Sequence, residues 1–229
     1  DNLTEENIYV LDSPILTNSQ FNKFKKFFSK KVKVIDCTFD IKSSLKDRIE
    51  TIREETETAV REGSTTLILS DKNISNHNAS IPSILTVGAV HSHLVKHGLR
   101  GYCSLNVECS DALDTHSFAV LIGVGATTVN PYLAIDSIYH RFEKNLFGKA
   151  DFESCVIKFK KSIDAGLLKI MSKMGISVIS SYRGGCNFEA VGLSRAIVSD
   201  YFSGMSSRIS GIGIIGIEKK IKELHKKFN

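Results

Sequence analysis

The chain of 229 residues has no tryptophan, only three prolines and few aromatic residues, 8% in all. It also has no apolar run near the roughly 20 residues needed to cross a bilayer, and no basic-then-apolar signal segment at its start, so we expect no membrane association. The five cysteines are odd in number and lack CxxC spacing, which favours reduced, buried thiols. We therefore expect a cytoplasmic protein, or a plastid-stromal one in a eukaryote. Because the chain starts at Asp1 without methionine, we also expect a segment of a longer protein.

The net charge of +5 is mild, and the lysines gather in residues 23–33 and 219–227. A nucleic-acid-binding protein usually carries a denser basic face with aromatic residues interleaved, so we interpret both lysine groups as solvated helix faces. The apolar fraction of 42% is enough for a substantial core. Valine, isoleucine, leucine and alanine supply most of it, as is typical of parallel α/β sheets.

Short β-rich runs alternate with segments of helical periodicity along most of the chain. The expected strands are residues 8–11, 32–35, 66–69, 105–107, 126–130 and 176–180. The expected helices lie around residues 21–28, 45–60, 82–97, 114–122, 134–145, 152–174, 186–191, 194–201 and 217–228. This alternation predicts an α/β fold of mainly parallel strands joined by right-handed crossover helices, either an open sheet or an incomplete barrel. We expect one domain over residues 1–229, in which residues 203–229 form an irregular connector and a final helix leading towards a following domain.

The most distinctive stretch is the turn Ser181-Tyr182-Arg183-Gly184-Gly185, placed between an expected strand and an expected helix. Backbone amides at such a turn, together with one arginine, are typical of an anion-binding site. Arg183 would equally suit an anchor for a neighbouring loop or domain. The pair Ser207-Arg208 is a weaker candidate of the same kind. The candidate anion-binding or domain-interface residues are therefore Ser181, Arg183, Gly184, Gly185, Ser207 and Arg208.

His91, His93 and His97 invite a metal hypothesis, which we disfavour. His93 and His97 share one helix face, whereas His91 lies about 200° around the helix from His93. No carboxylate or cysteine stands at a helical step to complete the ligand set, and a closed zinc site needs four ligands. We expect these histidines to be structural.

Two other patterns give little support for a functional site. Gly211, Gly213 and Gly216 match GxGxxG, but the expected secondary structure lacks the βαβ unit that a dinucleotide site requires. Cys186 lies at an expected helix start, which lowers a thiol pKa, but no histidine is adjacent in the sequence.

Carboxylates also follow the strand expected at residues 105–107, where α/β enzymes place catalytic groups. Asp114 is explained more simply as a helix cap and Asp111 as a turn residue. Glu108 has no evident acid–base partner, so we assign no catalytic, cofactor-binding or metal-binding residue.

Several long runs resemble, in order, the central domain of the glutamate synthase large chain. These runs are VLDSPILTNSQF, LILSDKNIS, IPSILTVGAVHSHLVKHGLR, GVGATTVNPYLAIDSI, GLLKIMSKMGISVISSYRGGCNFEAVGL and YFSGMSSRISGIG. They cover the chain from about Tyr9 to Gly213. The chain departs from the usual family pattern at His116-Ser117, where two histidines are usual, at Val124, where tyrosine is usual, and at SYRGGCN, where SYRGAQ is usual.

The resemblance implies a multidomain enzyme that makes two glutamates from glutamine and 2-oxoglutarate. An amidotransferase domain of the same chain would release ammonia, and a flavin-binding barrel with FMN and an iron–sulfur cluster would reduce the iminoglutarate. NAD(P)H, through a small electron-donating subunit or a fused domain, or else reduced ferredoxin, would supply electrons. The central domain would resemble a degenerate barrel without flavin, and would link the other domains and help to wall an ammonia passage. The alternative that we retain is a freestanding phosphate-ligand α/β enzyme using the Arg183 turn.

Overall fold

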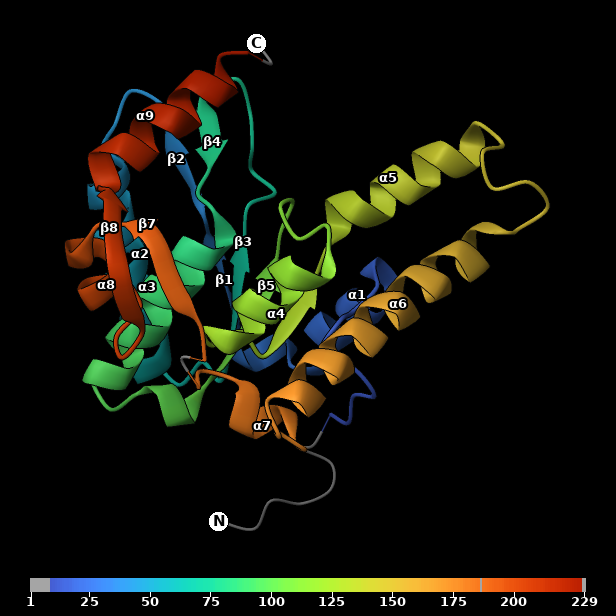
Figure 1. Cartoon of the computed structure of the whole chain (residues 1–229), viewed down its shortest axis with the longest axis horizontal. Coiled ribbons are helices and arrows are strands. Elements are labelled where there is room, and N and C mark those ends of the chain that lie inside the picture. Colours follow the sequence, from blue (N-terminus) through green and yellow to red (C-terminus); the bar gives the residue numbers. More distant parts are fainter. Residues whose placement is uncertain (1–8, 186, 228–229) are drawn as a thin grey trace.

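The computed structural model describes residues 9–185 and 187–227. Its strands are β1 (Val32–Asp36), β2 (Thr38–Asp40), β3 (Thr66–Ser70), β4 (Asn78–Ser80), β5 (Ser104–Glu108), β6 (Thr128–Asn130), β7 (Glu189–Leu193) and β8 (Ser206–Ile212). Four of them form a parallel sheet in the order β1-β3-β5-β6 (Figure 1), while β2 pairs with β4 antiparallel and β7 pairs with β8 parallel. The predicted α/β class with crossover helices is confirmed, and in the described part of the chain the four-stranded sheet does not close into a barrel.

The helices are α1 (Asn18–Phe27), α2 (Leu45–Arg61), α3 (Ser83–Lys96), α4 (Thr115–Gly123), α5 (Tyr132–Glu143), α6 (Phe152–Lys173), α7 (Ile179–Tyr182), α8 (Arg195–Tyr201) and α9 (Ile214–His225), with 3-10 turns η2 (Ser29–Lys31) and η3 (Arg100–Tyr102). Ser44 caps α2 through its side chain, and Gly63 follows that helix with a φ of +94°. Both are the signals that bound this helix in the sequence. Within the described ranges, no helix has the length and apolar character of a bilayer span.

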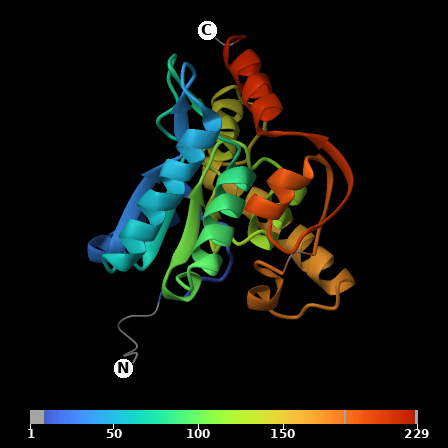
Figure 2. The same ribbon diagram turned by 90° about the vertical axis from the view of Figure 1, so that its left-hand side faces the viewer.

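The sheet separates two apolar clusters. Leu67 and Leu69 of β3 face the main core with α2 and α3, which lie side by side in Figure 2. Ile68 points to the opposite side and packs against Phe21 and Phe24 of α1. All five residues of β3 are buried, as expected for a parallel strand covered on both faces.

A short N-terminal segment lies beside β6 and takes the place of an expected strand. Ile15 forms a parallel bridge with Val129, the amide of Leu16 donates to the Val129 carbonyl at 2.9 Å, and the Val129 amide donates to the Pro14 carbonyl at 2.8 Å. The strand expected at residues 8–11 is wrong for its described part, 9–11, which forms no strand. The strand expected at residues 176–180 is also wrong. Because the outer edge of β6 is already occupied, that segment has no strand to pair with. Residues 176–178 form no helix or strand, and the short helix α7 begins at Ile179.

The C-terminal region also differs from expectation. β8 lies within residues 203–216, which were expected to be irregular, and β7 lies where a helix over 186–191 was expected. The reason is close backbone contact, since a Cβ added to Gly211 would lie 2.3 Å from the Gly192 carbonyl oxygen. These two glycines therefore permit an irregular parallel pairing rather than a flexible connector.

Helices α5 and α6 form a hairpin that extends away from the sheet (Figure 1). Phe152 packs against Tyr139 and Phe142, with ring centroids 5.4 and 6.0 Å apart, and so holds the two helices together. The connection at residues 144–150 carries Leu146 and Phe147, which are 65% and 37% exposed. The hairpin, called the α5–α6 arm below, thus presents apolar side chains to its surroundings.

Candidate functional site

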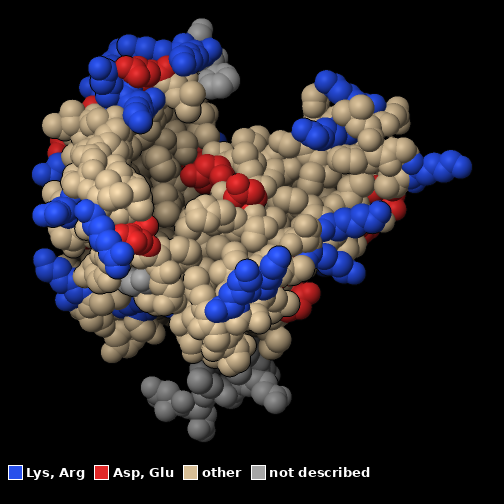
Figure 3. Space-filling model, viewed as in Figure 1, with Lys and Arg blue, Asp and Glu red and all other residues tan. Residues whose placement is uncertain are grey.

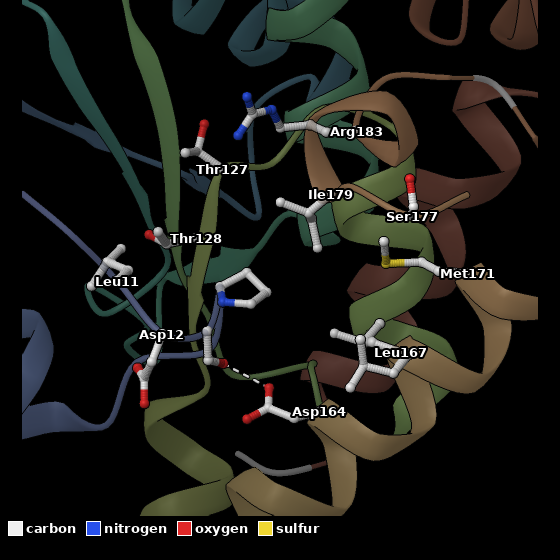
Figure 4. A pocket seen from close by; sticks show the side chains of 13 residues that line it. Leu11, Asp12, Thr127, Thr128, Asp164, Leu167, Met171, Ser177, Ile179 and Arg183 are labelled. Atoms are coloured by element: carbon white, nitrogen blue, oxygen red, sulfur yellow. Dashed lines mark hydrogen bonds between the residues drawn. The ribbon is translucent and has the colours of Figure 1, made fainter.

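A pocket of about 390 Å³ lies between α6, the N-terminal segment and the Arg183 turn (Figure 4). Its lining residues are Leu11, Asp12, Ser13, Pro14, Thr127, Thr128, Asp164, Leu167, Leu168, Met171, Ser177, Ile179 and Arg183. Thr127 and Thr128 stand at the start of β6, so the pocket opens at the amino end of this strand. Enzymes with parallel sheets place their chemistry at the opposite, carboxyl edge.

The Arg183 turn is anchored in the core by Tyr182, the last residue of α7. Its ring is fully buried, and its hydroxyl donates a 3.0 Å hydrogen bond to the carbonyl of Ala119 in α4. Burial raises the pKa of Tyr182 to about 12, so the side chain stays neutral. Because the next residue is Arg183, this anchor determines where the arginine emerges.

The backbone amides of the turn are bonded to protein carbonyls. The amide of Arg183 donates to Ile179 at 2.9 Å, that of Gly184 to Ile122 at 3.3 Å, and that of Gly185 to Tyr182 at 3.2 Å. These bonds join the turn to α7 and to the end of α4. The amides therefore serve the fold and do not form the anion-binding nest that the glycines suggested.

The side chain of Arg183 is half-buried and points towards Thr127 at one end of the pocket (Figure 4). Within the described part of the chain, no carboxylate forms an ion pair with it. At the other end of the pocket, Ser13 donates a 2.6 Å hydrogen bond to Asp164, whose pKa is raised by burial. The pocket thus has one cationic and one acidic end, separated by apolar side chains.

The imidazole of His91 packs against Gly184 of the Arg183 turn and against Gly125, and it leaves no room for a side chain at either position. A Cβ on Gly125 would lie 2.4 Å from His91 Nδ1, and one on Gly184 would lie 3.0 Å from His91 Cε1. Arg100 donates from Nε to His91 Nδ1 at 3.1 Å, so this nitrogen is the acceptor of a neutral imidazole. Burial, together with the positive charges of Arg100 and Arg183, lowers the pKa of His91 to about 4.

Acidification is expected to destabilise the chain through His91. In the unfolded chain the imidazole takes up a proton near its ordinary pKa of about 6.5, whereas in the folded chain it resists protonation down to about 4. Stability is therefore unaffected by this group above pH 6.5 and falls as the pH is lowered from there towards 4. At pH 5, after allowance for solvent screening, the loss is roughly 1–2 kcal/mol relative to pH 7. Urea unfolding of wild type and His91→Gln at both pH values measures it, and an equal pH dependence in the two proteins would contradict it.

The other candidate residues of the anion hypothesis lie apart from the pocket. Ser181 is exposed on α7, and Ser207 and Arg208 lie on β8, which contributes nothing to the pocket lining. The Ser207 hydroxyl is buried and has no hydrogen-bond partner within the described ranges. The Arg208 side chain is 85% exposed, and its Nε lies 3.6 Å from Glu189. The structure therefore leaves Arg183 as the one member of the set whose side chain lines the pocket.

The carboxylates at the end of β5 and just after it are engaged by other residues of the chain. Glu108 accepts hydrogen bonds from Ser70 at 2.7 Å and Lys25 at 2.9 Å, and Lys72 lies 3.0 Å away. Burial raises the pKa of Glu108, but these partners outweigh it and hold the pKa below its usual value.

The two aspartates that follow are helix caps. Asp111 lies in a bend of the chain, in keeping with its prediction as a turn residue, and it also accepts hydrogen bonds from the amide and hydroxyl of Ser83 at the start of α3, at 2.8 and 2.6 Å. Asp114 caps α4, as predicted, by accepting from the amide of Ser117 at 2.8 Å.

The glycine motif has a packing role. Gly213 lies between β8, which was not expected, and α9; within the described residues no strand follows α9, so this strand and helix do not make up a βαβ unit. Gly211 permits the contact with Gly192, and a Cβ on Gly216 would lie 2.5 Å from Ile212. Both glycines are explained without a nucleotide. Cys186 lies outside the described residues.

The histidine hypothesis gains a residue that sequence reasoning missed. Glu57 of α2 reaches His93 of α3 with its Oε2 atom 2.7 Å from His93 Nε2, and 3.9 Å from His97 Nδ1. His91 is not part of this cluster. A carboxylate on a different helix leaves no spacing signal in the sequence, because the helices meet only in the fold.

Comparison with known proteins decides the family. Residues 1–194 match the family model described as "Glutamate synthase central domain". The chain belongs to the glutamate synthase central domain family. The resemblance of the long sequence runs to this domain is thereby confirmed.

Relatives with different electron donors in their names match nearly the whole chain. It is 52% identical over 225 residues to the "Glutamate synthase [NADPH] large chain" of Azospirillum brasilense, covering 97% of this chain and 15% of that protein. It is 40% identical to the protein of the same name from Bacillus subtilis, covering 94% of this chain and 14% of that protein. It is 36% identical to the "Ferredoxin-dependent glutamate synthase" of Pyropia yezoensis, covering 95% of this chain and 15% of that protein. The chain thus spans about a seventh of the length of these glutamate synthases.

Proposed function

We propose that this glutamate synthase central domain is a non-catalytic linking domain of a larger enzyme that converts glutamine and 2-oxoglutarate into two glutamates. Its role is to hold an amidotransferase domain and a flavin-binding domain of the same chain in register, and to keep ammonia from water between them. The observation that carries the proposal is the domain's membership of this family over most of its length.

The state of the polar groups supports a structural role. At the carboxyl edge of the sheet, where a catalytic barrel holds its reactive groups, Glu108 is neutralised by Lys25 and Lys72, and Asp111 caps a helix. Side chains bound to each other in this way are poorly placed to accept protons from a substrate. FMN and an iron–sulfur cluster accordingly belong, in our proposal, to the following domain of the parent chain. NAD(P)H or ferredoxin is the electron source that the names of the relatives favour.

The surface supports a role in holding other domains. The α5–α6 arm carries exposed apolar side chains, namely Leu133, Tyr139, Leu146, Phe147, Ile157 and Leu168. Figure 3 shows broad uncharged areas on the face that bears the arm, with many of the Lys and Arg side chains towards the margins. Exposed apolar surface of this extent on one element is typical of a contact with another protein surface.

The proposed linking role can be tested in the full-length parent enzyme. The double variant Leu146→Asp/Phe147→Asp places two charges at the arm tip, and Lys144→Asp, in the same connection, is the matched control. If the tip contacts another domain, glutamine-driven glutamate formation is expected to fall by about tenfold or more, as for a contact worth about 1.4 kcal/mol or more. Formation driven by added ammonium should fall less, because it bypasses the transfer between domains. Unchanged rates from both nitrogen sources, or measurable glutamine turnover by the purified 229-residue chain alone, would contradict the proposal.

The freestanding phosphate-ligand enzyme remains the second candidate, because Arg183 lines a pocket and lacks a carboxylate partner in the part of the chain that the structure describes. In this candidate enzyme, however, the arginine that would bind the anion lies apart from the carboxylate at the end of β5. Arg183 lies near the start of β6 and Glu108 at the carboxyl edge, a separation of about 10 Å along three residues of strand. This candidate predicts that inorganic phosphate raises the melting temperature of the wild type and not of Arg183→Ala.

A further inference from the structure

Three metal-ligating side chains from two helices meet on the outer side of the core. Helices α2 and α3 pack against each other, with Glu57 on the first, His93 on the second, and His97 four residues later at the C-cap of α3. One ligand atom from each residue lies within 4.8 Å of the others. The side chains of Glu57 and His93 are 22% and 16% exposed, and that of His97 is 35% exposed. The cluster is thus partly shielded and still open to solvent on one side.

The carboxylate of Glu57 is oriented before any ion arrives. Arg61, one turn further along α2, donates from Nε to Glu57 Oε1 at 2.9 Å, so Oε2 is left to face the histidines. An ionised carboxylate fixed by a neighbouring side chain is the form in which this group binds metals.

His97 has a defined tautomer. Its Nδ1 lies 2.8 Å from the carbonyl oxygen of His93, a distance that requires the proton on Nδ1. The lone pair of the neutral ring is then on Nε2. Metal-binding histidines usually donate their second ring nitrogen to a backbone carbonyl or carboxylate in this way, which fixes the ring and its basicity.

We propose that Glu57, His93 and His97 bind a divalent transition-metal ion, for which Zn²⁺ is the best fit, between α2 and α3. Two imidazoles and one carboxylate are a ligand set that Zn²⁺ accepts, and water would complete four-coordination. With metal–ligand bonds of about 2.0–2.1 Å, ligand atoms in a tetrahedral site are about 3.3 Å apart. Glu57 Oε2 lies 2.7 Å from His93 Nε2, closer than that value, so the two side chains must separate slightly to admit the ion. The 3.9 Å contact from Oε2 to His97 is made by Nδ1, so the His97 ring must rotate to present Nε2 to the ion. The ion would replace the proton shared by Glu57 and His93.

A bound ion is expected to cross-link α2 and α3, two helices of the main core. Glu57 and His93 are 36 residues apart in sequence, so an ion held by both fixes the packing of α2 on α3. Binding to the folded chain alone raises its stability by mass action. This role is independent of the linking function proposed above and of the Arg183 pocket.

Zinc titration of the purified 229-residue chain, free of any affinity tag and in competition with a chromophoric chelator, tests the site. One equivalent of Zn²⁺ is expected, and Glu57→Gln, His93→Gln and His97→Gln should each weaken binding by at least about tenfold. Cobalt as a replacement should give the intense visible absorption of a four-coordinate site in the wild type and lose it in His97→Gln.

His140→Gln and Cys155→Ser are the matched controls, because His140 is exposed on α5 and Cys155 is a partly buried thiol on α6. Neither change should alter the affinity. Circular dichroism without metal verifies folding, and His97→Gln, at the most exposed ligand, remains informative if a change at His93 perturbs the core. Absence of stoichiometric binding, binding that survives all three ligand changes, or binding lost in Cys155→Ser would each overturn the proposal.

Discussion

Replacing Tyr182 by alanine is expected to lower the free energy of unfolding by about 3–5 kcal/mol, the range for removing a buried aromatic ring. The side chain is fully buried, its hydroxyl is bonded to the Ala119 carbonyl, and Phe188 packs edge-on against it at a centroid distance of 6.1 Å. α7 has only four residues, and besides Tyr182 the Arg183 turn is joined to α4 by the 3.3 Å hydrogen bond from the Gly184 amide to the Ile122 carbonyl. The loss should therefore also release the turn from the rim of the pocket.

Tyr182→Phe is the matched control, since it keeps the ring and removes only the hydroxyl. It should cost about 0.5–1.5 kcal/mol, the net value of one hydrogen bond. Chemical unfolding followed by circular dichroism gives both values, and hydrogen exchange at the amides of Gly184 and Gly185 reports on the turn. A loss below 1.5 kcal/mol for Tyr182→Ala, within the range set for its control, would mean that the ring does not anchor the turn.

Gly125→Ala is expected to lower the free energy of unfolding by about 2–4 kcal/mol, because two costs act at one residue. Gly125 has a φ of +129°, which side chains rarely adopt, and an added Cβ would lie 2.4 Å from His91 Nδ1. Its carbonyl also accepts a 2.9 Å hydrogen bond from Arg100, so the backbone cannot relax without disturbing the support of His91.

Gly63→Ala separates the two costs. Gly63 has a φ of +94° with nothing within 4 Å of an added Cβ, so it tests backbone strain without a clash. We expect a loss of about 1–2 kcal/mol there. Thermal and urea unfolding of both variants supply the comparison. Equal losses at the two positions would show that His91 moves aside freely and does not shape the turn.

Local pattern was sufficient for the elements that pair or pack in a regular way. The four strands of the main sheet were expected from short apolar runs, and α6 from apolar residues at steps of three and four. The inner strands are buried on both faces, and α6 buries one recurring side of its sequence. The helix cap at Asp114 was also readable, because a cap depends on residues within three positions of each other.

The sequence pattern gave wrong predictions where the structure of a segment depends on the segment that lies next to it in the fold. Residues 176–180 contain three β-branched apolar residues, but the edge of β6 that they would need is occupied by Pro14–Leu16. The glycine-rich stretch 203–216 suggested an irregular connector, yet Gly211 and Gly192 bring two backbones together as a parallel pair. A strand exists only with a partner, and the partner in each case is distant in sequence.

By itself, the sequence determined the α/β class, the order of the main elements and, through long runs of residues, the resemblance to glutamate synthase central domains. These depend on local periodicity and on residue identity, which the chain carries directly. Only the tertiary structure decided which side chains meet. It bonded the amides of the Arg183 turn to α4 and α7, neutralised Glu108 with two lysines, and brought Glu57 to His93 and His97. Contacts of this kind join residues from different elements, and their geometry follows from the packing of the core rather than from spacing along the chain.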